Sequence, residues 1–448
     1  MINLYIMICN FSQSRSMVVM FTLLYTSFNL HSQSYYYPSN GNWDTKTPSE
    51  MGWCEERVDS LNDFLERRNS KAFIIVHKGK IVLEEYYGTF TADSLWYWAS
   101  AGKSLMGFLV GVAQQDGLLD IDDAVSDYLG NGWTSCTGSQ ELQIKIRHQI
   151  SMTTGLQDQI KPTTEIPDPS NCLKPECLQY ETAPGTQWAY HNAPYRLTQD
   201  VLEKVSGLSS TLYTFNTLRD LDFRGAWVNY VFFSKPREMA KFGLLALSNG
   251  TWNGKAILRD TAYFRAMTHS SQSINPAYGY LWWLNGQKSY RLPGLDIDFN
   301  GSMVPEAPAD MYAALGKNDQ KIYVVPSEDL VVVRMGNSAI DKQFALSSFD
   351  RQLWQYINAL ECPTAIDDLA STLQTTVYPN PCMQSSQLHV RTSKPVSLQV
   401  LSLQGSLLFE SETAATIHTI PTDGWAKGSY LLQTNSMEVY QRQLLTIY

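Results

Sequence analysis

The sequence predicts an α+β fold in which strands from both ends of the main domain form one sheet beside a helical region. "KAFIIVHKGKIVLEEYYG" indicates a hairpin from about Ala72 to Tyr87, because blocks of β-forming residues meet at the turn Lys78-Gly79-Lys80. Two further strands follow late in the chain, "KIYVVP" (321–326) and "LVVVRMG" (330–336). Helical patterns fill most of the sequence between these two pairs of strands.

Three of the predicted helices end at residues that favour helix termination. The run that follows Trp96 continues to about Gln115 and ends at Asp116-Gly117. "YRLTQDVLEKVSG" ends at Gly207, and "PREMAKFGLLALSNG" ends at Asn249-Gly250. After the late strands, "DKQFALSSFDRQLWQYINAL" is typical of an amphipathic helix.

Length and composition limit the class of protein. The chain has 448 residues, of which 44% are hydrophobic, so it is too long for one ordinary core and too apolar for disorder. The formal net charge is −9, and no cluster of lysine and arginine interrupts the acidic balance. These features argue against a nucleic-acid partner and favour small substrates or neutral polymers.

The first 34 residues are interpreted as a signal peptide. Arg15 precedes an apolar run (17–30), and the small residues Ser32 and Ser34 suit cleavage before Tyr35. The run is short for a bilayer span, although a membrane anchor or a true start at Met17 are the alternatives. We therefore expect an exported protein.

An exported chain can form disulfides, and six of the seven cysteines remain after removal of the signal peptide. Cys172 and Cys177 are close enough to close a small ring, which the chain-entropy model values at roughly 2 kcal/mol. A zinc site would need a second pair of ligands nearby, and the neighbouring sequence has none. The pairing of the other four stays open: Cys54, Cys136, Cys362 and Cys382.

Composition changes near residue 361, at "CPTAIDDLASTLQTT". From Val377 onward, short strands alternate with turns that contain glycine, serine or proline, which is typical of a small all-β sandwich. We expect a main domain over 35–360, a linker over 361–376 and a C-terminal module over 377–448.

Ser100 and Lys103 are the first candidates for chemistry, in "WASAGKSLMGFLVGV". A serine hydroxyl needs a base within hydrogen-bond reach, and residues three apart on a helix have Cβ atoms roughly 5–6 Å apart. Burial in the apolar run would lower the pKa of Lys103 from about 10.4 towards neutrality. The alternative is a lysine whose stem lies on the core while its ammonium reaches water.

Two later segments extend this pattern, "IRHQISMTTGL" (146–156) and Tyr190-His191-Asn192 ahead of another helix. With them, residues 35–360 resemble the serine β-lactamase and penicillin-binding protein superfamily, specifically its class C-like branch with esterase and amide-hydrolase relatives. The resemblance implies a β-lactamase/transpeptidase-like fold: an antiparallel sheet flanked by helices, plus a helical subdomain. It also implies that Ser100 attacks a carbonyl, that Lys103 and Tyr190 move the protons, and that Asn192 binds the substrate amide or the lysine.

The third motif of that superfamily is Lys-Thr-Gly or His-Gly-Gly, and "ALGKNDQ" stands in its place. We expect Lys317 and Gln320 to bind substrate there, the alternative for Lys317 being a solvated turn lysine. Asp319 replaces a glycine, which puts β-lactam turnover in doubt, since a side chain would occupy space needed by the ligand. The backbone N–H groups of Ser100 and of the strand after Asp319 are the expected oxyanion donors.

Four segments of the C-terminal module, "VYPNP", "LQVLSLQGSLL", "GWAKGSYLLQT" and "QRQLLTIY", resemble the type IX secretion sorting domain. This resemblance implies recognition by the type IX secretion machinery and delivery to the outer-membrane cell surface or the medium. A carbohydrate-binding sandwich is the alternative.

Together these observations predict an exported serine hydrolase that cleaves an ester or amide, including a β-lactam or a D-Ala peptide, through an acyl-enzyme on Ser100. We expect a small-molecule or peptide substrate, no metal or organic cofactor and no nucleic acid; the oligomeric state stays open. The competing hypothesis is a catalytically silent surface protein that binds peptidoglycan or peptide through the same cleft.

Overall fold

The fold comes from a computed structural model. The residues that it describes are 35–39, 42–158, 162, 168–340, 345–362, 374–384, 386–403, 405–411, 413–435 and 440–448. The predicted signal peptide and most of the predicted linker lie outside these ranges. Among the described residues, no helix is long and apolar enough to cross a bilayer.

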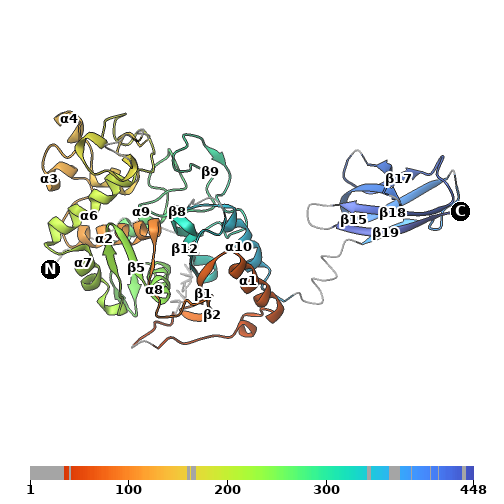
Figure 1. The fold of residues 1–448 in the computed structure, drawn as a ribbon, viewed down its shortest axis with the longest axis horizontal. Helices are drawn as coiled ribbons and strands as arrows, with labels where there is room; N and C mark the ends of the chain where they lie inside the picture. The colour runs from red at the N-terminus through yellow and green to blue at the C-terminus, as the bar shows by residue number, and fades with distance from the viewer. Residues whose placement is uncertain are drawn as a thin grey trace, which may run out of the picture.

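One antiparallel sheet joins strands from both ends of the main domain, as predicted (Figure 1). Its strands, in spatial order, are β2 (Lys80–Tyr86), β1 (Ser70–His77), β13 (Leu330–Gly336), β12 (Gln320–Val325), β11 (Tyr312–Gly316) and β8 (Trp283–Leu284). β1 lies beside β13 with Ile75 opposite Val332, so an early hairpin and a late hairpin share one ladder. The burial of these β-branched side chains is the main stabilisation of the sheet.

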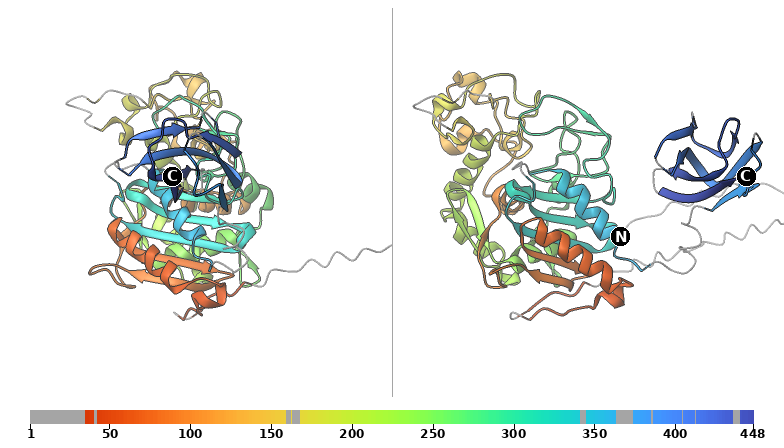
Figure 2. Two further views of the ribbon diagram at one scale, coloured as in Figure 1. Left: turned by 90° about the vertical axis from the view of Figure 1, so that its right-hand side faces the viewer. Right: turned by 45° about the vertical axis from the view of Figure 1, so that its right-hand side comes forward.

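Helices cover both faces of the sheet. α1 (Glu55–Arg67) and α10 (Ser348–Asn358) lie side by side on one face (Figure 2), with the ring centroids of Phe64 and Tyr356 4.4 Å apart. α8 (Pro236–Leu247) packs on the other face, where Gly243 lets its backbone approach: an added Cβ would lie 2.4 Å from Val331 Cγ1. The sheet is therefore the middle layer of this domain.

The helical region lies beside this sheet (Figure 1). Its helices are α2 (Gly102–Gln115), α3 (Val125–Leu129), α4 (Gly138–Glu141), α5 (Ile146–Ile150), α6 (Asn192–Ser206), α7 (Ser210–Thr217) and α9 (Thr261–Thr268). α2 is buried from Gly102 to Ala113, and the Tyr263 hydroxyl of α9 donates to the Gly107 carbonyl at 2.7 Å. Because α2 is buried on all sides, any polar group on it needs a partner inside the protein.

Short strands complete the domain. They are β3 (Trp96–Tyr97), β4 (Ala226–Val228), β5 (Val231–Ser234), β6 (Thr251–Trp252), β7 (Lys255–Ala256), β9 (Ser289–Tyr290) and β10 (Phe299–Asn300). β3 pairs with β5, and next to this pair the buried Trp98 donates its indole N–H to Ser234 Oγ at 2.8 Å. The segment that leads to Ser100 is thus fastened to the domain.

The C-terminal strands form a curled sheet with its own core. They are β14 (Thr375–Tyr378), β15 (Gln387–Ser402), β16 (Leu407–Glu410), β17 (Ala415–Pro421), β18 (Gly428–Asn435) and β19 (Tyr440–Ile447). The first half of β15 pairs with β14 and β17, whereas its second half pairs with β16 and β18. Leu388, Val390, Leu398 and Val400 alternate into the apolar interior between these halves.

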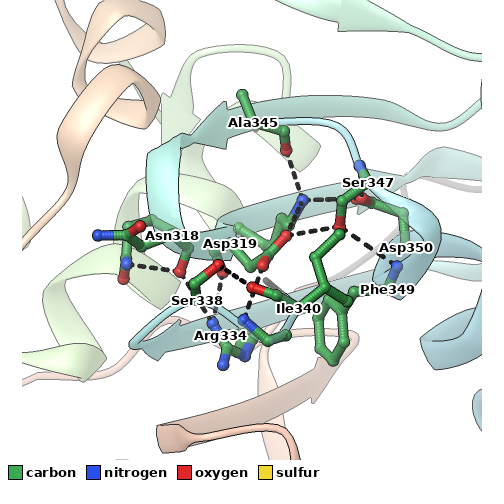
Figure 3. A network of polar contacts seen from close by, with 12 residues as sticks. Asn318, Asp319, Arg334, Ser338, Ile340, Ala345, Ser347, Phe349 and Asp350 are labelled. Carbon is green, nitrogen blue, oxygen red and sulfur yellow. Dashed lines mark hydrogen bonds and ion pairs between the residues drawn. The ribbon is translucent and has the colours of Figure 1, made fainter. Parts of the chain in front are cut away.

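A buried polar network fixes the turn between β11 and β12 (Figure 3). Lys321 Nζ lies 2.8 Å from Asp350 Oδ1 and 3.2 Å from Asp319 Oδ1, and all three side chains are fully buried. Asp319 also accepts from the Ala339 N–H at 3.0 Å and from Ser347 Oγ at 2.9 Å. One lysine thereby connects the turn to α10.

Arg334 ties the same turn to the start of β1. Its guanidinium donates to the carbonyls of Asp319 at 2.9 Å and Arg68 at 2.7 Å, and to Ser70 Oγ at 3.0 Å. Burial lowers the pKa of Arg334 to about 10, so the side chain stays charged at neutral pH. Such a cation is tolerated in the core because carbonyl and carboxylate groups surround it.

Two disulfides stabilise the main domain. Cys172 pairs with Cys177, the small ring that the sequence predicts. Cys54 pairs with Cys362, 308 residues later, and joins the start of α1 to the segment after α10. Cys136 and Cys382 are unpaired within the described residues.

We expect the double substitution Cys54→Ser/Cys362→Ser to lower the free energy of unfolding by about 2–4 kcal/mol, because a long loop loses its cross-link in the unfolded state. Urea unfolding followed by tryptophan fluorescence measures this change. The matched control is Cys172→Ser/Cys177→Ser, which opens a much shorter loop. An equal or larger loss in the control would contradict the expectation.

Two neighbouring residues of α10, Asp350 and Arg351, allow the loss of a buried charge to be compared with the loss of an exposed one. Asp350→Ala leaves Lys321 and the Tyr323 hydroxyl without their shared carboxylate, and we expect it to destabilise the protein by about 3–5 kcal/mol. Arg351→Ala breaks an exposed pair with Glu306 and should cost less than about 1 kcal/mol. Urea unfolding of both variants checks this difference; similar losses would show that the network contributes little.

Candidate active site

Ser100 stands in a strained turn at the entrance to α2. It is the middle residue of the 3-10 turn η2 (Ala99–Ala101), so it precedes the helix by one turn instead of lying within it. Ala99 has φ +49°, a conformation that costs free energy for a residue with a Cβ. The turn thus presents a half-buried hydroxyl beside the first turn of a helix.

Lys103 lies one turn away, and its ammonium is enclosed. Its Nζ donates to Ser100 Oγ at 3.1 Å and to Asn192 Oδ1 at 2.9 Å. The residue is 5% exposed, and no carboxylate forms an ion pair with it among the described residues. Burial first, and then the positive charge of Arg196, lowers the pKa of Lys103 to about 7. A neutral amine is therefore accessible near physiological pH.

Tyr190, which lies two residues before α6, forms a hydrogen bond with the same serine. Burial raises its pKa to about 12, and a hydrogen bond with Ser100 partly offsets that rise. Tyr190 therefore holds its proton at neutral pH. Its ring centroid lies 5.1 Å from Lys103 Nζ.

Asn192 is the first residue of α6, and Tyr195 lies three residues later on the same helix face. The Tyr195 ring centroid is 4.4 Å from Lys103 Nζ, so two aromatic faces contact the ammonium. Tyr195 is a site residue that the motifs did not predict, although its spacing of three residues from Asn192 places it on the same helix face. His191, between the two motif residues, is buried, and burial lowers its pKa to about 4.

Aromatic residues form the wall behind Tyr190. The segment "YGYLWWLNG" supplies Tyr278 and Trp283, whose ring centroids are 5.0 Å apart. Trp283 stacks on Tyr190 at 5.8 Å, and Trp188 packs against Tyr278 at 5.4 Å. These residues are core residues that also hold the Tyr190 ring in place.

The hairpin of β11 and β12 approaches the backbone of the nucleophile turn. A Cβ on Gly316 would lie 2.4 Å from the Trp98 carbonyl oxygen and 2.9 Å from the Ala101 nitrogen, so only glycine fits. β11 therefore ends directly against the turn that carries Ser100. The glycine at 316, rather than the residues after it, is what makes this contact possible.

The two predicted substrate-binding residues of this segment differ in exposure, although the turn that carries Lys317 lies against the Ser100 turn. Lys317 is exposed on the turn η6 (Lys317–Asp319), and within the described residues no hydrogen bond or ion pair joins its side chain to the site. Gln320 is fully buried: its Nε2 donates to the carbonyls of Gly336 at 2.6 Å and Asn318 at 2.9 Å, and its Oε1 accepts from the Gly336 N–H. The prediction for Gln320 is wrong, because its amide is consumed by backbone groups.

Asp319 also differs from expectation. We predicted that its side chain would occupy space beside a ligand, but the carboxylate points into the buried network with Lys321 (Figure 3). Its backbone has φ +57°, the conformation for which relatives would use glycine. The ion pair and hydrogen bonds of the carboxylate offset this strain.

Two parts of the chain are similar to known protein families. A model of the Beta-lactamase family matches residues 60–229, and a model of the Secretion system C-terminal sorting domain matches residues 376–447. An uncharacterized protein of Alkalihalophilus pseudofirmus is 25% identical over 63% of this chain and 87% of its own length. Protein flp of Staphylococcus aureus is 24% identical over 33% of this chain and 32% of its own length.

Solved structures show the same fold. A structure titled "Putative 6-aminohexanoate-dimer hydrolase from Bacillus anthracis" has a TM-score of 0.52 and 15% identity over 71% of this chain and 86% of its own. A structure titled as a putative beta-lactamase from Bacteroides dorei has a TM-score of 0.53 and 16% identity over 69% of this chain and 99% of its own. The sorting domain marks the chain for export to the cell surface or the medium. The chain thus contains a Beta-lactamase domain match at residues 60–229, within a main domain of β-lactamase-like and penicillin-binding-protein-like fold, and a C-terminal type IX secretion sorting domain at residues 376–447.

Proposed function

We propose that this protein is an active hydrolase that cleaves an ester or amide through a covalent acyl-enzyme on Ser100. The observation that carries the proposal is the position of Lys103 Nζ, which is buried between Ser100 Oγ and Asn192 Oδ1 and has a pKa of about 7. A buried structural lysine is normally paired with a carboxylate, as Lys321 is with Asp350, whereas the hydrogen-bond partners of Lys103 are a hydroxyl and an amide oxygen, which let it lose its proton. A base with this pKa can accept a proton near neutral pH.

In the first step, Ser100 Oγ forms a bond to the substrate carbonyl carbon while its proton passes to neutral Lys103. Tyr190, which keeps its proton at neutral pH, is hydrogen-bonded to Ser100 and relays a proton from Lys103 to the leaving alcohol or amine. Water then attacks the acyl carbon, its proton follows the reverse route, and the acid is released with Ser100 restored. Asn192 holds the Lys103 ammonium while each tetrahedral intermediate persists.

The oxyanion of each tetrahedral intermediate needs backbone donors beside Ser100. The Ser100 N–H precedes the first turn of α2, where the helix dipole favours negative charge. We propose the end of β11 as the source of the second donor, since Gly316 brings that strand against the Ser100 turn. This replaces the strand after Asp319, β12, as the expected donor.

Esters and amides are the proposed substrate class, and the titles of the similar structures fit it. The Bacillus anthracis structure is titled a putative 6-aminohexanoate-dimer hydrolase, and the Bacteroides dorei structure a putative beta-lactamase. We further propose that the C-terminal module is the part recognised by the type IX secretion machinery. The hydrolase would then act on substrates outside the cell.

Ser100→Ala should lower kcat for a p-nitrophenyl ester by about 10³-fold or more, because the covalent route is lost. Ser104→Ala is the matched control: Ser104 is a buried serine of α2 whose hydroxyl donates to the Leu281 carbonyl. The purified protein is assayed with an ester panel, a chromogenic cephalosporin and a penicillin label followed by intact mass. Equal behaviour of wild type and Ser100→Ala on every substrate, with no adduct, would favour the silent binding protein.

The rate should rise with pH through about 7, because Lys103 is an active base only after it loses its proton. The measurement is kcat/KM for a p-nitrophenyl ester from pH 5 to 9. Burial lowers the pKa of both His148 and His191 to about 4, so neither can produce this limb. Lys103→Arg, which stays protonated, should lose the activity across the whole range. A flat profile between pH 5 and 9 would exclude Lys103 as the base.

A further inference from the structure

Three polar residues form a row along α6 at intervals of four residues. They are Asn192, Arg196 and Asp200, and all three are half-buried, whereas the residues between them are buried. Residues four apart on a helix lie on the same face. The row is therefore the partly exposed face of this half of α6, and it begins at the residue that binds Lys103.

The tip of the hairpin of β4 and β5 contacts this row. Tyr230, which lies between the two strands, donates its hydroxyl to Asp200 Oδ1 at 3.2 Å, and its ring centroid is 5.4 Å from Arg196 Cζ. The Trp98 N–H donates to the Phe232 carbonyl at 2.8 Å, and β5 contacts the Ser100 turn η2. Arg196 thus lies between α6 and a hairpin that borders the nucleophile.

Arg196 brings a positive charge to this position without a carboxylate partner. Its Nη1 donates to the Asn171 carbonyl at 3.3 Å, and within the described residues its guanidinium forms no other hydrogen bond and no ion pair. Hydrogen bonds from Asn171 and Ser170 lower the pKa of Asp168, and Arg196 adds a smaller effect, but Asp168 and Arg196 do not form an ion pair. Most of the five guanidinium N–H groups are therefore available to a ligand.

The charge of Arg196 acts on the candidate site. Burial is the main reason why the pKa of Lys103 falls to about 7, and the positive charge of Arg196 adds to that effect. Charges influence each other in this way at short range, since water and salt screen charges that lie further apart. An anionic group of a substrate bound at Ser100 would be attracted by the same guanidinium.

We propose that Arg196 binds a carboxylate of the substrate, so that the enzyme prefers esters or amides that carry a carboxylate in addition to the scissile group. The planar guanidinium offers paired N–H groups that match the two oxygens of a carboxylate. The Tyr230 ring supports the guanidinium from one side. Its place on α6 differs from that of Lys317, the cation of the third motif. This inference rests on the proposed function.

The kinetic test compares esters of equal length that end in a carboxylate or in a methyl group. One series, the p-nitrophenyl half-esters of adipate, pimelate and suberate, has the carboxylate on the acyl side; acetate esters of ω-hydroxycarboxylic acids have it on the alcohol side. We expect kcat/KM to favour the carboxylate ester by about tenfold or more in at least one series, as charge-assisted hydrogen bonds would give. In Arg196→Met this preference should fall to about one. Arg196→Lys, which keeps the charge without the planar donors, should retain part of it.

The preference is a ratio measured on one enzyme, so a change in the pKa of Lys103 caused by Arg196→Met cancels, because both esters use the same base. The matched control is Lys204→Met, which removes a positive charge from the last turn of α6, about 12 Å further along the helix, and should leave the preference intact. A wild-type enzyme that hydrolyses both kinds of ester equally in both series would overturn the proposal. So would a preference that survives Arg196→Met.

A binding experiment keeps this test independent of catalysis. Titration calorimetry into the full-chain Ser100→Ala protein should show that monomethyl adipate, which keeps one carboxylate, binds about tenfold more tightly than dimethyl adipate. Adding Arg196→Met should remove this difference. If no ester is hydrolysed but the difference depends on Arg196 in this way, the proposed function fails while the assignment of Arg196 stands. If esters are hydrolysed but the two adipates bind equally, the assignment is overturned and the proposed function stands.

Discussion

The burial of one ammonium group is the constraint on which the candidate site depends. A charge inside α2 is unfavourable, so the protein has to surround Lys103 with a hydroxyl, an amide oxygen and two aromatic faces. The groups that satisfy this requirement come from the turn before α2, from Tyr190 just before α6, and from α6 itself. What stabilises the lysine therefore also aligns the serine with its base.

The hairpin of β11 and β12 satisfies a second geometric requirement of the candidate site. β11 has to approach the Ser100 turn closely, and the turn after it has two consecutive residues with positive φ, Asn318 and Asp319. The chain tolerates this conformation because Lys321 binds the Asp319 carboxylate and Arg334 donates to the Asp319 carbonyl oxygen. The Asp319 carboxylate thereby becomes part of the core.

The sequence predicted what depends on period and spacing. The two hairpins, the buried helix after Trp96 and the approach of Ser100, Lys103 and Tyr190 follow from local patterns and from the resemblance to known hydrolases. Gln320 was misjudged because its partners, the backbone groups of Gly336 and Asn318, are set by the register of β12 against β13. The close approach of Gly316 to the Ser100 turn could not be predicted, since β11 and this turn meet only in three dimensions.

The pairing of β1 with β13 has a consequence for how the protein is made. Ser70 lies opposite Gly336, so the sheet cannot close until more than half of the chain is available, and the early hairpin has an unpaired edge until then. Folding of such non-local pairings is slow. The core of the main domain therefore closes only after the late hairpin is available, and until then the open edge of β1 can pair with the strands of other chains.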